Sequence, residues 1–293
     1  MRVIVHGGAG GVPDEPDERQ AVLDRAAGVG TDGSTPVEAV CSAVRILESS
    51  PRFNAGVGSA VQSDGYIRTD AGLMTDDRDA GAACSMPGVE HAVDVARVVK
   101  DETPHVLVSG VHAVDLADAF GIETDVDLWT ERTRQQWDDL DEHPTGDARD
   151  HAVWVSERFG GAPEGDAHDH DTVGAVATDG ERVAAATSTG GRWLALAGRV
   201  GDVPQIGSGF YCTDAGGASA TGAGEDIARV TLSRRVVEHL DSGMGARAAA
   251  DAAIEEFGSL VEGSAGVIVL RPDGDAGSAF NSDAMQTSVA GTV

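Results

Sequence analysis

The hydrophobic positions in the first part of the chain separate into short apolar runs and segments with helical spacing. Residues 2–5 (RVIV) form an apolar run typical of a short buried strand, and a glycine-rich segment at 6–11 follows directly. A helix is expected next, at about 17–28. The pattern therefore predicts that the chain begins with a strand, a tight glycine-rich loop and a helix.

A second helix has both an expected start and an expected buried face. Thr35 is placed as its N-cap, with Pro36 at the first helical position and Glu38 closing a capping box. Apolar residues then recur at the three- and four-residue spacing of one helical face. These residues are Val37, Val40, Cys41, Val44 and Leu47.

The remaining elements before residue 121 alternate between strand and helix. They are a hairpin turning at 64–65, a strand near 81–86, a helix at about 91–101, a strand at 105–109 and a helix at about 111–119. The second half repeats this mixture without any internal sequence repeat. Its expected elements are the strands 172–178, 182–189, 209–214 and 217–221, helices at about 225–241 and 245–257, and a final hairpin of 266–270 and 277–281. Such a pattern favours stacked sheets with helices outside.

Residues 121–171 differ in composition from both flanking parts. They are rich in Asp, Glu, His and Gly, and poor in aliphatic residues after Trp137. The stretch from about 140 to 171, which ends in the acidic run 164–171, therefore predicts an exposed, mobile linker. Thr172 then opens a strand abruptly, which makes the junction Asp171–Thr172 a candidate for chemistry.

Length and charge narrow the class of protein. The 293 residues, of which 41% are hydrophobic, suffice for one large core or for two halves that share one. The net charge of −28 makes nucleic acid an unfavourable partner, because such a surface repels phosphate. The single Lys100 and the two Asn residues, combined with this acidity, favour a protein from a high-salt cell over an ordinary acidic protein.

Apolar runs and cysteines bear on where the protein acts. No apolar run approaches the length of a membrane span, and the N-terminal segment lacks the apolar stretch of a signal peptide. Cys41, Cys84 and Cys212 are odd in number and widely spaced, without a CxxC pair. This argues against a disulfide scaffold or a zinc site, and we expect a cytoplasmic protein without a membrane partner.

A threonine at the start of a rigid strand could serve as a nucleophile if a base lay beside its hydroxyl. One such base is the α-amine of the same residue, which exists only if the chain is cut before it. Its reference pKa is about 7.7–8.0, so part of it is unprotonated at neutral pH. The linker ending in Asp171, followed by Thr172, is compatible with a self-cleaving design of this kind.

At this point the chain resembles a known family, the plant-type asparaginases or isoaspartyl peptidases of the N-terminal-nucleophile hydrolases. The resemblance extends in order over nearly the whole chain and is weakest at 121–169. Its segments are Val5-His-Gly-Gly-Ala-Gly10, Phe53-Asn-Ala-Gly-Val-Gly58, Thr103-Pro-His-Val106, His170-Asp-Thr-Val-Gly-Ala-Val176, Ala186-Thr-Ser-Thr-Gly-Gly191, Gly198-Arg-Val-Gly-Asp202 and Ala220-Thr-Gly-Ala-Gly-Glu225.

The resemblance implies a fold and a maturation pathway. The fold would be of the α+β class, a four-layer αββα sandwich. Cleavage before Thr172 would give an α subunit, 1–171, and a β subunit, 172–293, which stay together as one folded unit and form a homodimer of cleaved protomers. The reaction would convert L-asparagine to L-aspartate and ammonia, or hydrolyse a β-aspartyl (isoaspartyl) dipeptide.

The resemblance also implies roles for individual residues. Thr172 would be the nucleophile and Thr189 would tune it through a hydrogen bond. The Thr221 hydroxyl and the Gly222 backbone N–H would stabilise the oxyanion, and Asn54 would lie close to the nucleophile. Gly222 and Gly224 would let the substrate approach the backbone. Many relatives carry a hydroxyl residue where this chain has Ala223, so one supporting contact is expected to be missing.

Two charged residues would recognise the amino-acid end of the substrate. The resemblance pairs Arg199 with the α-carboxylate and Asp202 with the α-ammonium group. No organic cofactor is implied. The resemblance also makes the loop around Asn54, from about Leu47 to Val57, a candidate site where backbone carbonyls would bind a monovalent cation such as sodium. Its residues are Leu47, Glu48, Ser50, Phe53, Ala55 and Val57.

Several alternatives are weighed against this interpretation. The His6-Gly-Gly segment lacks the Gly-x-Ser-x-Gly elbow of lipases and the lysine of a P-loop, so we expect it to pack beneath the active site. A metal cluster at His168–Asp171 is disfavoured because a mobile linker lacks rigidity. A glycosylasparaginase and, from another class, an uncleaved non-catalytic binding protein remain open, although Gly190-Gly191 fits the former poorly.

Overall fold

The computed structural model describes residues 1–158 and 172–293. Its strands are β1 (Arg2–Gly10), β2 (Arg68–Thr75), β3 (Ala80–Pro87), β4 (Leu107–Ser109), β5 (Val173–Thr178), β6 (Val183–Thr189), β7 (Phe210–Thr213), β8 (Gly216–Gly222), β9 (Ala265–Leu270), β10 (Ala276–Phe280) and β11 (Ala284–Gly291). Its helices are α1 (Pro16–Gly30), α2 (Pro36–Glu48), α3 (Ala92–Glu102), α4 (Val111–Ala119), α5 (Glu131–Asp138), α6 (Ala148–Arg158), α7 (Gly224–Val230), α8 (Leu232–Asp241) and α9 (Ala246–Leu260).

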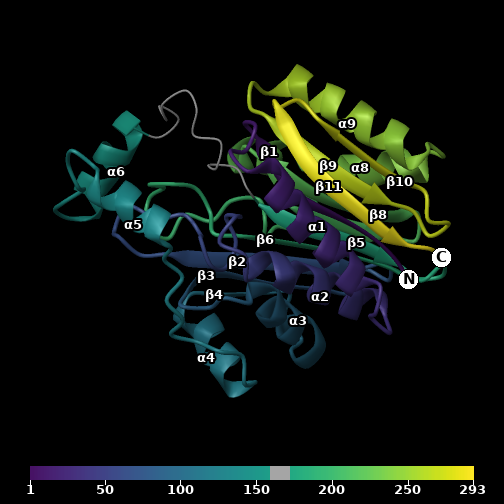
Figure 1. Cartoon of the computed structure of the whole chain (residues 1–293), viewed down its shortest axis with the longest axis horizontal. Coiled ribbons are helices and arrows are strands. Elements are labelled where there is room, and N and C mark those ends of the chain that lie inside the picture. Colours follow the sequence, from purple (N-terminus) through teal and green to yellow (C-terminus); the bar gives the residue numbers. More distant parts are fainter. Residues whose placement is uncertain (159–171) are drawn as a thin grey trace.

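Two sheets stack between two sets of helices (Figure 1). The larger sheet has the order β11-β1-β5-β6-β2-β3-β4, and the smaller has the order β10-β9-β8-β7. Helices α1, α2 and α3 contact the larger sheet, whereas α8 and α9 contact the smaller one. The predicted four-layer αββα sandwich is thereby confirmed.

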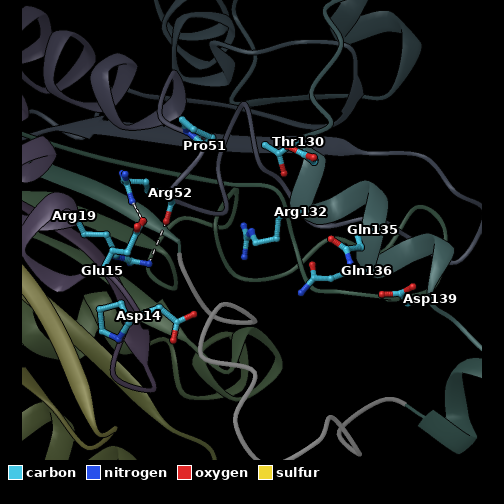
Figure 2. Close-up of a pocket in the computed structure, with 12 residues that line it drawn as sticks. Asp14, Glu15, Arg19, Pro51, Arg52, Thr130, Arg132, Gln135, Gln136 and Asp139 are labelled. Carbon is cyan, nitrogen blue, oxygen red and sulfur yellow. Dashed lines mark hydrogen bonds and ion pairs between the residues drawn. The ribbon is translucent and has the colours of Figure 1, made fainter.

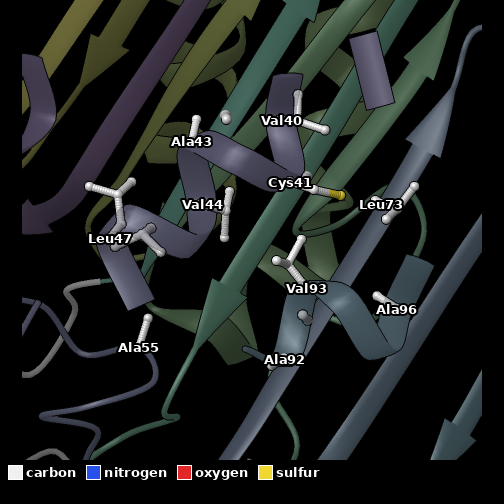
Figure 3. Close-up of a cluster of buried hydrophobic side chains, with 14 of the residues drawn as sticks. Val40, Cys41, Ala43, Val44, Leu47, Ala55, Leu73, Ala92, Val93 and Ala96 are labelled. Carbon is white, nitrogen blue, oxygen red and sulfur yellow. The ribbon is translucent and has the colours of Figure 1, made fainter. Parts of the chain in front are cut away.

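Helix α2 shows how the sequence builds the outer layer. The Thr35 side chain accepts a hydrogen bond from the Glu38 N–H, as expected of an N-cap, but the Glu38 carboxylate bonds to Ser34 and not to Thr35. The predicted apolar face of this helix is largely buried, with Val40, Cys41, Val44 and Leu47 at most 1% exposed. Figure 3 shows this face packing with α3 against the strands of the larger sheet.

The inner face of the larger sheet is organised in rows of residues that lie side by side on neighbouring strands. Because alternate residues of a strand face the same way, successive rows are two residues apart. One row contains Ile4, Val176, Ala185 and Met74, all buried in the apolar core between the sheets. The next row contains His6, Gly174, Thr187 and Gly72. The row after that holds Thr189 opposite Asp70, with Thr172 just before β5.

Several elements differ from the sequence-based expectation. β1 continues past residue 5 to Gly10, with a register irregularity between His6 and Ala9. The helix expected at 225–241 is two helices, because Thr231 adopts a left-handed conformation with φ of 56°. Helix α6, at Ala148–Arg158, lies within the stretch expected to be a linker.

The ends of the chain lie together at one edge of the larger sheet. β11, which the sequence analysis did not predict, pairs antiparallel with β1, and the Met1 ammonium donates to the Thr292 carbonyl at 3.1 Å. Among the described residues, no helix combines the length and the apolar character needed to cross a bilayer.

Candidate active site

Thr172 lies at the entry to a central strand of the larger sheet. It directly precedes β5, which pairs with β1 on one side and β6 on the other. The residue is only 6% exposed. Strands on both sides therefore fix β5, which begins directly after this residue.

Thr189, at the end of β6, contacts the Thr172 hydroxyl as predicted. The Thr172 Oγ1 donates to the Thr189 Oγ1 at 3.2 Å, and the Gly191 N–H donates to the same oxygen at 3.2 Å. The Thr189 hydroxyl in turn donates to the Asn54 carbonyl at 3.4 Å. Because a hydroxyl has one proton and two lone pairs, this pattern directs the Thr172 proton toward Thr189.

Asn54 holds its loop against the end of β6. Its Oδ1 accepts from the Ala60 N–H at 2.8 Å, and its Nδ2 donates to the Gly191 carbonyl at 2.6 Å. Its own carbonyl accepts from the Gly190 N–H at 2.8 Å. The expectation that Asn54 lies near the nucleophile agrees with this geometry, since it contacts Thr189 and both glycines that follow.

The candidate oxyanion residues belong to the other sheet. Thr221 ends the buried part of β8, and its Oγ1 accepts from the Ala9 N–H of β1 at 3.3 Å. Gly222 has a φ of 135°, and an added Cβ would come within 2.3 Å of the Ser264 carbonyl oxygen, so glycine is required there. Ala223 is the N-cap of α7 without a side-chain cap, consistent with the missing hydroxyl noted in the sequence.

Arg199 is held by a partner that the sequence analysis did not identify. Its Nε and Nη2 donate to the two carboxylate oxygens of Glu225, both at 2.8 Å, in a bidentate pair. An added Cβ at Gly224 would come within 2.7 Å of Asp202 Oδ1 and 2.9 Å of Arg199 Nη2. Gly224 therefore permits the two charged side chains to meet at the start of α7.

Two buried carboxyl groups lie close to this arginine. Burial raises the pKa of Asp202 to about 7, and the Arg199 guanidinium only partly opposes the shift. Burial likewise raises the pKa of Asp70 to about 7, although the Ser85 N–H donates to its Oδ1 at 2.6 Å. The Asp202 Oδ2 is buried and has no hydrogen-bond partner among the described residues. It is thus available to accept a hydrogen bond from a donor outside the described residues.

These residues surround one small cavity of about 10 Å³, enough for about one water molecule. It is lined by Thr172, Thr189, Gly191, Arg192, Arg199, Asp202, Gly222 and Gly224. The structure therefore brings the predicted nucleophile, its threonine partner and both predicted charged residues to one place. Thr221 directly precedes Gly222 and Asn54 contacts Thr189, but neither residue lines the cavity.

A larger cavity of about 950 Å³ lies between the start of α1, the segment 51–52 and α5 (Figure 2). Two of its arginines are already paired. Arg52 forms ion pairs with Glu15 and Glu18, and Arg19 donates to the Gly7 and Arg52 carbonyls. It contains none of the candidate catalytic threonines. Its size alone therefore does not make it the reaction site.

Some predicted residues cannot be placed and others were missed. Asp171 and the cluster His168–Asp171 lie outside the described residues. Glu225, Asp70 and Arg192 belong to the site but were not singled out by the sequence analysis. Glu225 ends a motif that the resemblance used, so its position was a usable signal, whereas Asp70 is revealed only by its strand register opposite Thr189.

Comparison with known proteins agrees with this geometry. A family model described as "Asparaginase" matches residues 1–292. A plant-type L-asparaginase of Pyrococcus furiosus is 39% identical over 97% of this chain and 94% of its own length. Isoaspartyl peptidase/L-asparaginases of Xenopus laevis and Homo sapiens are each 36% identical, over 97% and 93% of this chain and 90% and 87% of their own. The chain belongs to the asparaginase family of N-terminal-nucleophile amidohydrolases.

Proposed function

We propose that the protein hydrolyses side-chain amides of aspartate, either L-asparagine to L-aspartate and ammonia or a β-aspartyl dipeptide to its amino acids. The names of the relatives support both substrates. The observation that carries the proposal is the 3.2 Å contact between the Thr172 and Thr189 hydroxyls beside Arg199 and Asp202 in one cavity. An amino-acid end and a scissile amide would be recognised together there.

The base that activates Thr172 is the least obvious part of the mechanism. Among the described residues, the hydrogen-bond partner of its hydroxyl is Thr189, which is itself an alcohol and no base at neutral pH. His6 is buried nearby, but burial lowers its pKa to about 3 and its Nε2 contacts Ser219. The α-amine of Thr172, once freed, is the base that best fits this surrounding.

Freeing that amine requires a cut before Thr172. Its hydroxyl would attack the Asp171 carbonyl carbon, the acyl group would move from nitrogen to oxygen, and water would hydrolyse the ester. The products would be segments 1–171 and 172–293, which stay associated through the shared larger sheet.

Hydrolysis would then use both sheets. The Thr172 Oγ1 attacks the substrate carbonyl carbon while the α-amine takes its proton, which passes to the leaving nitrogen. The Thr221 hydroxyl and the Gly222 N–H stabilise the oxyanion, a contribution worth about a hundred- to a thousandfold in rate per donor. Arg199 would hold the substrate α-carboxylate and Asp202 its α-ammonium group, and water would resolve the acyl-enzyme.

The loop from Leu47 to Val57 is the proposed site for a monovalent cation. The Leu47, Glu48 and Ser50 carbonyls each accept a backbone N–H within the loop, which closes the turn around them. A carbonyl oxygen has a second lone pair, so these groups and those of Phe53, Ala55 and Val57 could also face a cation. When bound, the cation would supply rigidity to the loop that carries Asn54.

The proposed setting is a homodimer of cleaved protomers in a high-salt cytoplasm. The resemblance to the family supports the dimer. The charge of −28 and the single lysine support the salt-rich solvent. Neither feature enters the chemistry at Thr172.

One experiment separates the proposed activity from its alternatives. The purified protein is incubated in molar KCl, examined on a denaturing gel, and assayed with asparagine, a β-aspartyl dipeptide and a glycosylated asparagine. Two bands and hydrolysis of either of the first two substrates are expected. Preference for the glycosylated substrate would instead identify a glycosylasparaginase, and a single band without any hydrolysis would identify a non-catalytic protein.

A further inference from the structure

We propose that His6, Thr187 and Ser219 are positioning residues, which lock the two sheets in register directly beneath the catalytic threonines. The inference rests on the proposed function, since the reaction is what the locked register would serve. The need for such a lock follows from the site itself. Thr172 and Thr189 belong to the larger sheet, whereas Thr221 and Gly222 belong to the smaller one.

A continuous chain of hydrogen bonds crosses between the sheets at this level. His6 Nε2 lies 2.8 Å from Ser219 Oγ, which lies 2.7 Å from Thr187 Oγ1, and Thr187 Oγ1 lies 2.8 Å from the Gly209 carbonyl oxygen. The three side chains are all fully buried. His6 and Thr187 come from β1 and β6 of the larger sheet, and Ser219 comes from β8 of the smaller one.

Proton counting gives this chain a direction. A carbonyl oxygen only accepts, so the single Thr187 proton points to Gly209. The Ser219 hydroxyl must then donate to Thr187, and His6 Nε2–H must donate to Ser219. Every hydroxyl in the chain thus both donates and accepts, and the neutral His6 carries its proton on Nε2.

Gly174 makes room for this arrangement. It lies between His6 and Thr187 in the same row of the larger sheet. A Cβ at this position would come within 2.0 Å of Ser219 Oγ and 2.5 Å of His6 Nε2. The missing side chain leaves a gap in the row, and Ser219 enters that gap from the opposite sheet.

The chain lies one row below the catalytic residues. Thr187 precedes Thr189 by two residues and Ser219 precedes Thr221 by two residues, so each pair shares a strand face. The row beneath it is apolar, with Ile4, Val176 and Ala185 in the core between the sheets. Apolar contact is non-directional and allows small sliding, whereas hydrogen bonds prefer a fixed distance and angle.

His6 acts here through position rather than through proton transfer. Burial lowers its pKa to about 3, although the Thr172 backbone partly opposes the shift. The imidazole therefore remains neutral throughout the physiological range and is a poor base. A neutral donor is what the hydrogen-bond chain requires.

The test compares matched substitutions inside and outside the chain. Thr187→Val and Ser219→Ala remove one hydroxyl each from the chain. Thr178→Val and Thr213→Val remove buried hydroxyls away from the site, which bond to the Arg182 carbonyl and the Ala215 N–H respectively. The two inner variants should lower kcat and the rate of self-cleavage by about ten- to a hundredfold with KM changed less than about threefold, because a misplacement of about 1 Å can cost that much. The two outer variants should stay within about twofold.

Two further measurements separate positioning from mere stability and from the proposed function. Thr187→Ser restores the hydroxyl and should recover most of kcat, and it also serves if the valine variant does not fold. Crystal structures should show Thr221 displaced from Thr189 by several tenths of an ångström in Thr187→Val and not in Thr178→Val.

Unchanged Thr221 positions, or equal losses of kcat in inner and outer variants, would overturn the positioning role. A wild-type protein that neither cuts itself nor hydrolyses any substrate would overturn the proposed function instead. In that case the crystallographic comparison still decides whether the hydrogen-bond chain sets the register.

Discussion

At the scale of single residues, the site contains an arginine, Arg199, whose guanidinium is already paired with a carboxylate of the protein itself. Glu225 takes the Nε and Nη2 edge of Arg199 in a pair that is only partly exposed. The Arg199 side chain also lines the small cavity. A substrate carboxylate would then meet a prearranged donor, which lowers the entropy lost on binding.

Removing this orientation should weaken binding more than chemistry. Glu225→Gln is expected to raise KM for asparagine by about tenfold with a smaller effect on kcat, because an interaction equal in ground and transition states affects KM. Glu238→Gln, which breaks the exposed Arg234–Glu238 pair, is the matched control and should change neither constant. Steady-state kinetics of both variants would reject this role if KM moved equally in the two.

The raised pKa of Asp202, about 7, has a kinetic consequence. Only the ionised carboxylate attracts the substrate α-ammonium group, so binding should weaken as pH falls through 7. The pH profile of kcat/KM reports the free enzyme. As pH falls it should decrease with a slope of two, because Asp202 and the Thr172 amine each take up one proton. The pH profile of kcat reports the complex, in which the substrate ammonium group keeps Asp202 ionised. It should decrease with a slope of one, because only the Thr172 amine then takes up a proton. Profiles of identical slope below pH 7 would contradict this assignment.

At this scale, residues of the matching motifs could be expected from the sequence to lie together. The structure brings Thr172, Thr189, Arg199 and Asp202 to one cavity, as the resemblance implied. Sequence reasoning could not reveal Asp70, because that residue reaches the site only through the register of β2 against β6. Register depends on how whole strands pair, which spacing within one segment does not specify.

At the scale of elements, most strands and helices were predictable because their apolar spacing is regular. The break between α7 and α8 was not, since Thr231 has no sequence signal for its left-handed conformation. β11 was missed because its sequence, Ala284–Gly291, has few large apolar residues and no clear alternation, and only Met285 of the strand is buried. The glycines of β1 indicated a loop, whereas in the structure the strand continues through a bulge that carries His6 beneath Thr172.

Two glycine substitutions should have opposite effects on stability. Gly174→Ala places a Cβ against Ser219, His6 and the Ala186 carbonyl, and should lower the free energy of unfolding by about 1–3 kcal/mol. Gly28→Ala, within α1 and with nothing within 4 Å of the added Cβ, should raise it by about 0.4–1 kcal/mol. Urea unfolding of both variants measures the difference. Equal stability of the two would show that the row beneath the threonines is not tightly packed.

At the scale of the whole molecule, the sandwich places the catalytic residues where the two sheets meet. The order of the layers could be predicted from the alternation of strands and helices. The contact between Thr221 and β1 could not be predicted, because it joins the two halves of the chain. The net charge of −28 belongs to this scale as well. It acts on the compact state through repulsion summed over the surface.

Salt should therefore stabilise the protein by screening. Raising KCl from 0.1 to 2 M shortens the Debye length to about 3 Å or less, and the unfolding midpoint should rise by about 5–10 °C. Choline chloride at equal ionic strength should give a similar rise, because screening does not depend on the identity of the cation. A rise seen only with small metal cations, and saturating at millimolar concentration, would instead indicate site binding such as that proposed for the loop 47–57.

The most direct test of the central claim is the intact mass of freshly purified protein beside its Thr172→Ala variant. For the wild type we expect two masses, matching residues 1–171 and 172–293, whose sum equals the full chain plus one water. The variant should show only the full-length mass and no ammonia release from asparagine. A wild-type protein that hydrolyses asparagine while its mass remains that of the uncut chain would contradict the role of the freed Thr172 amine.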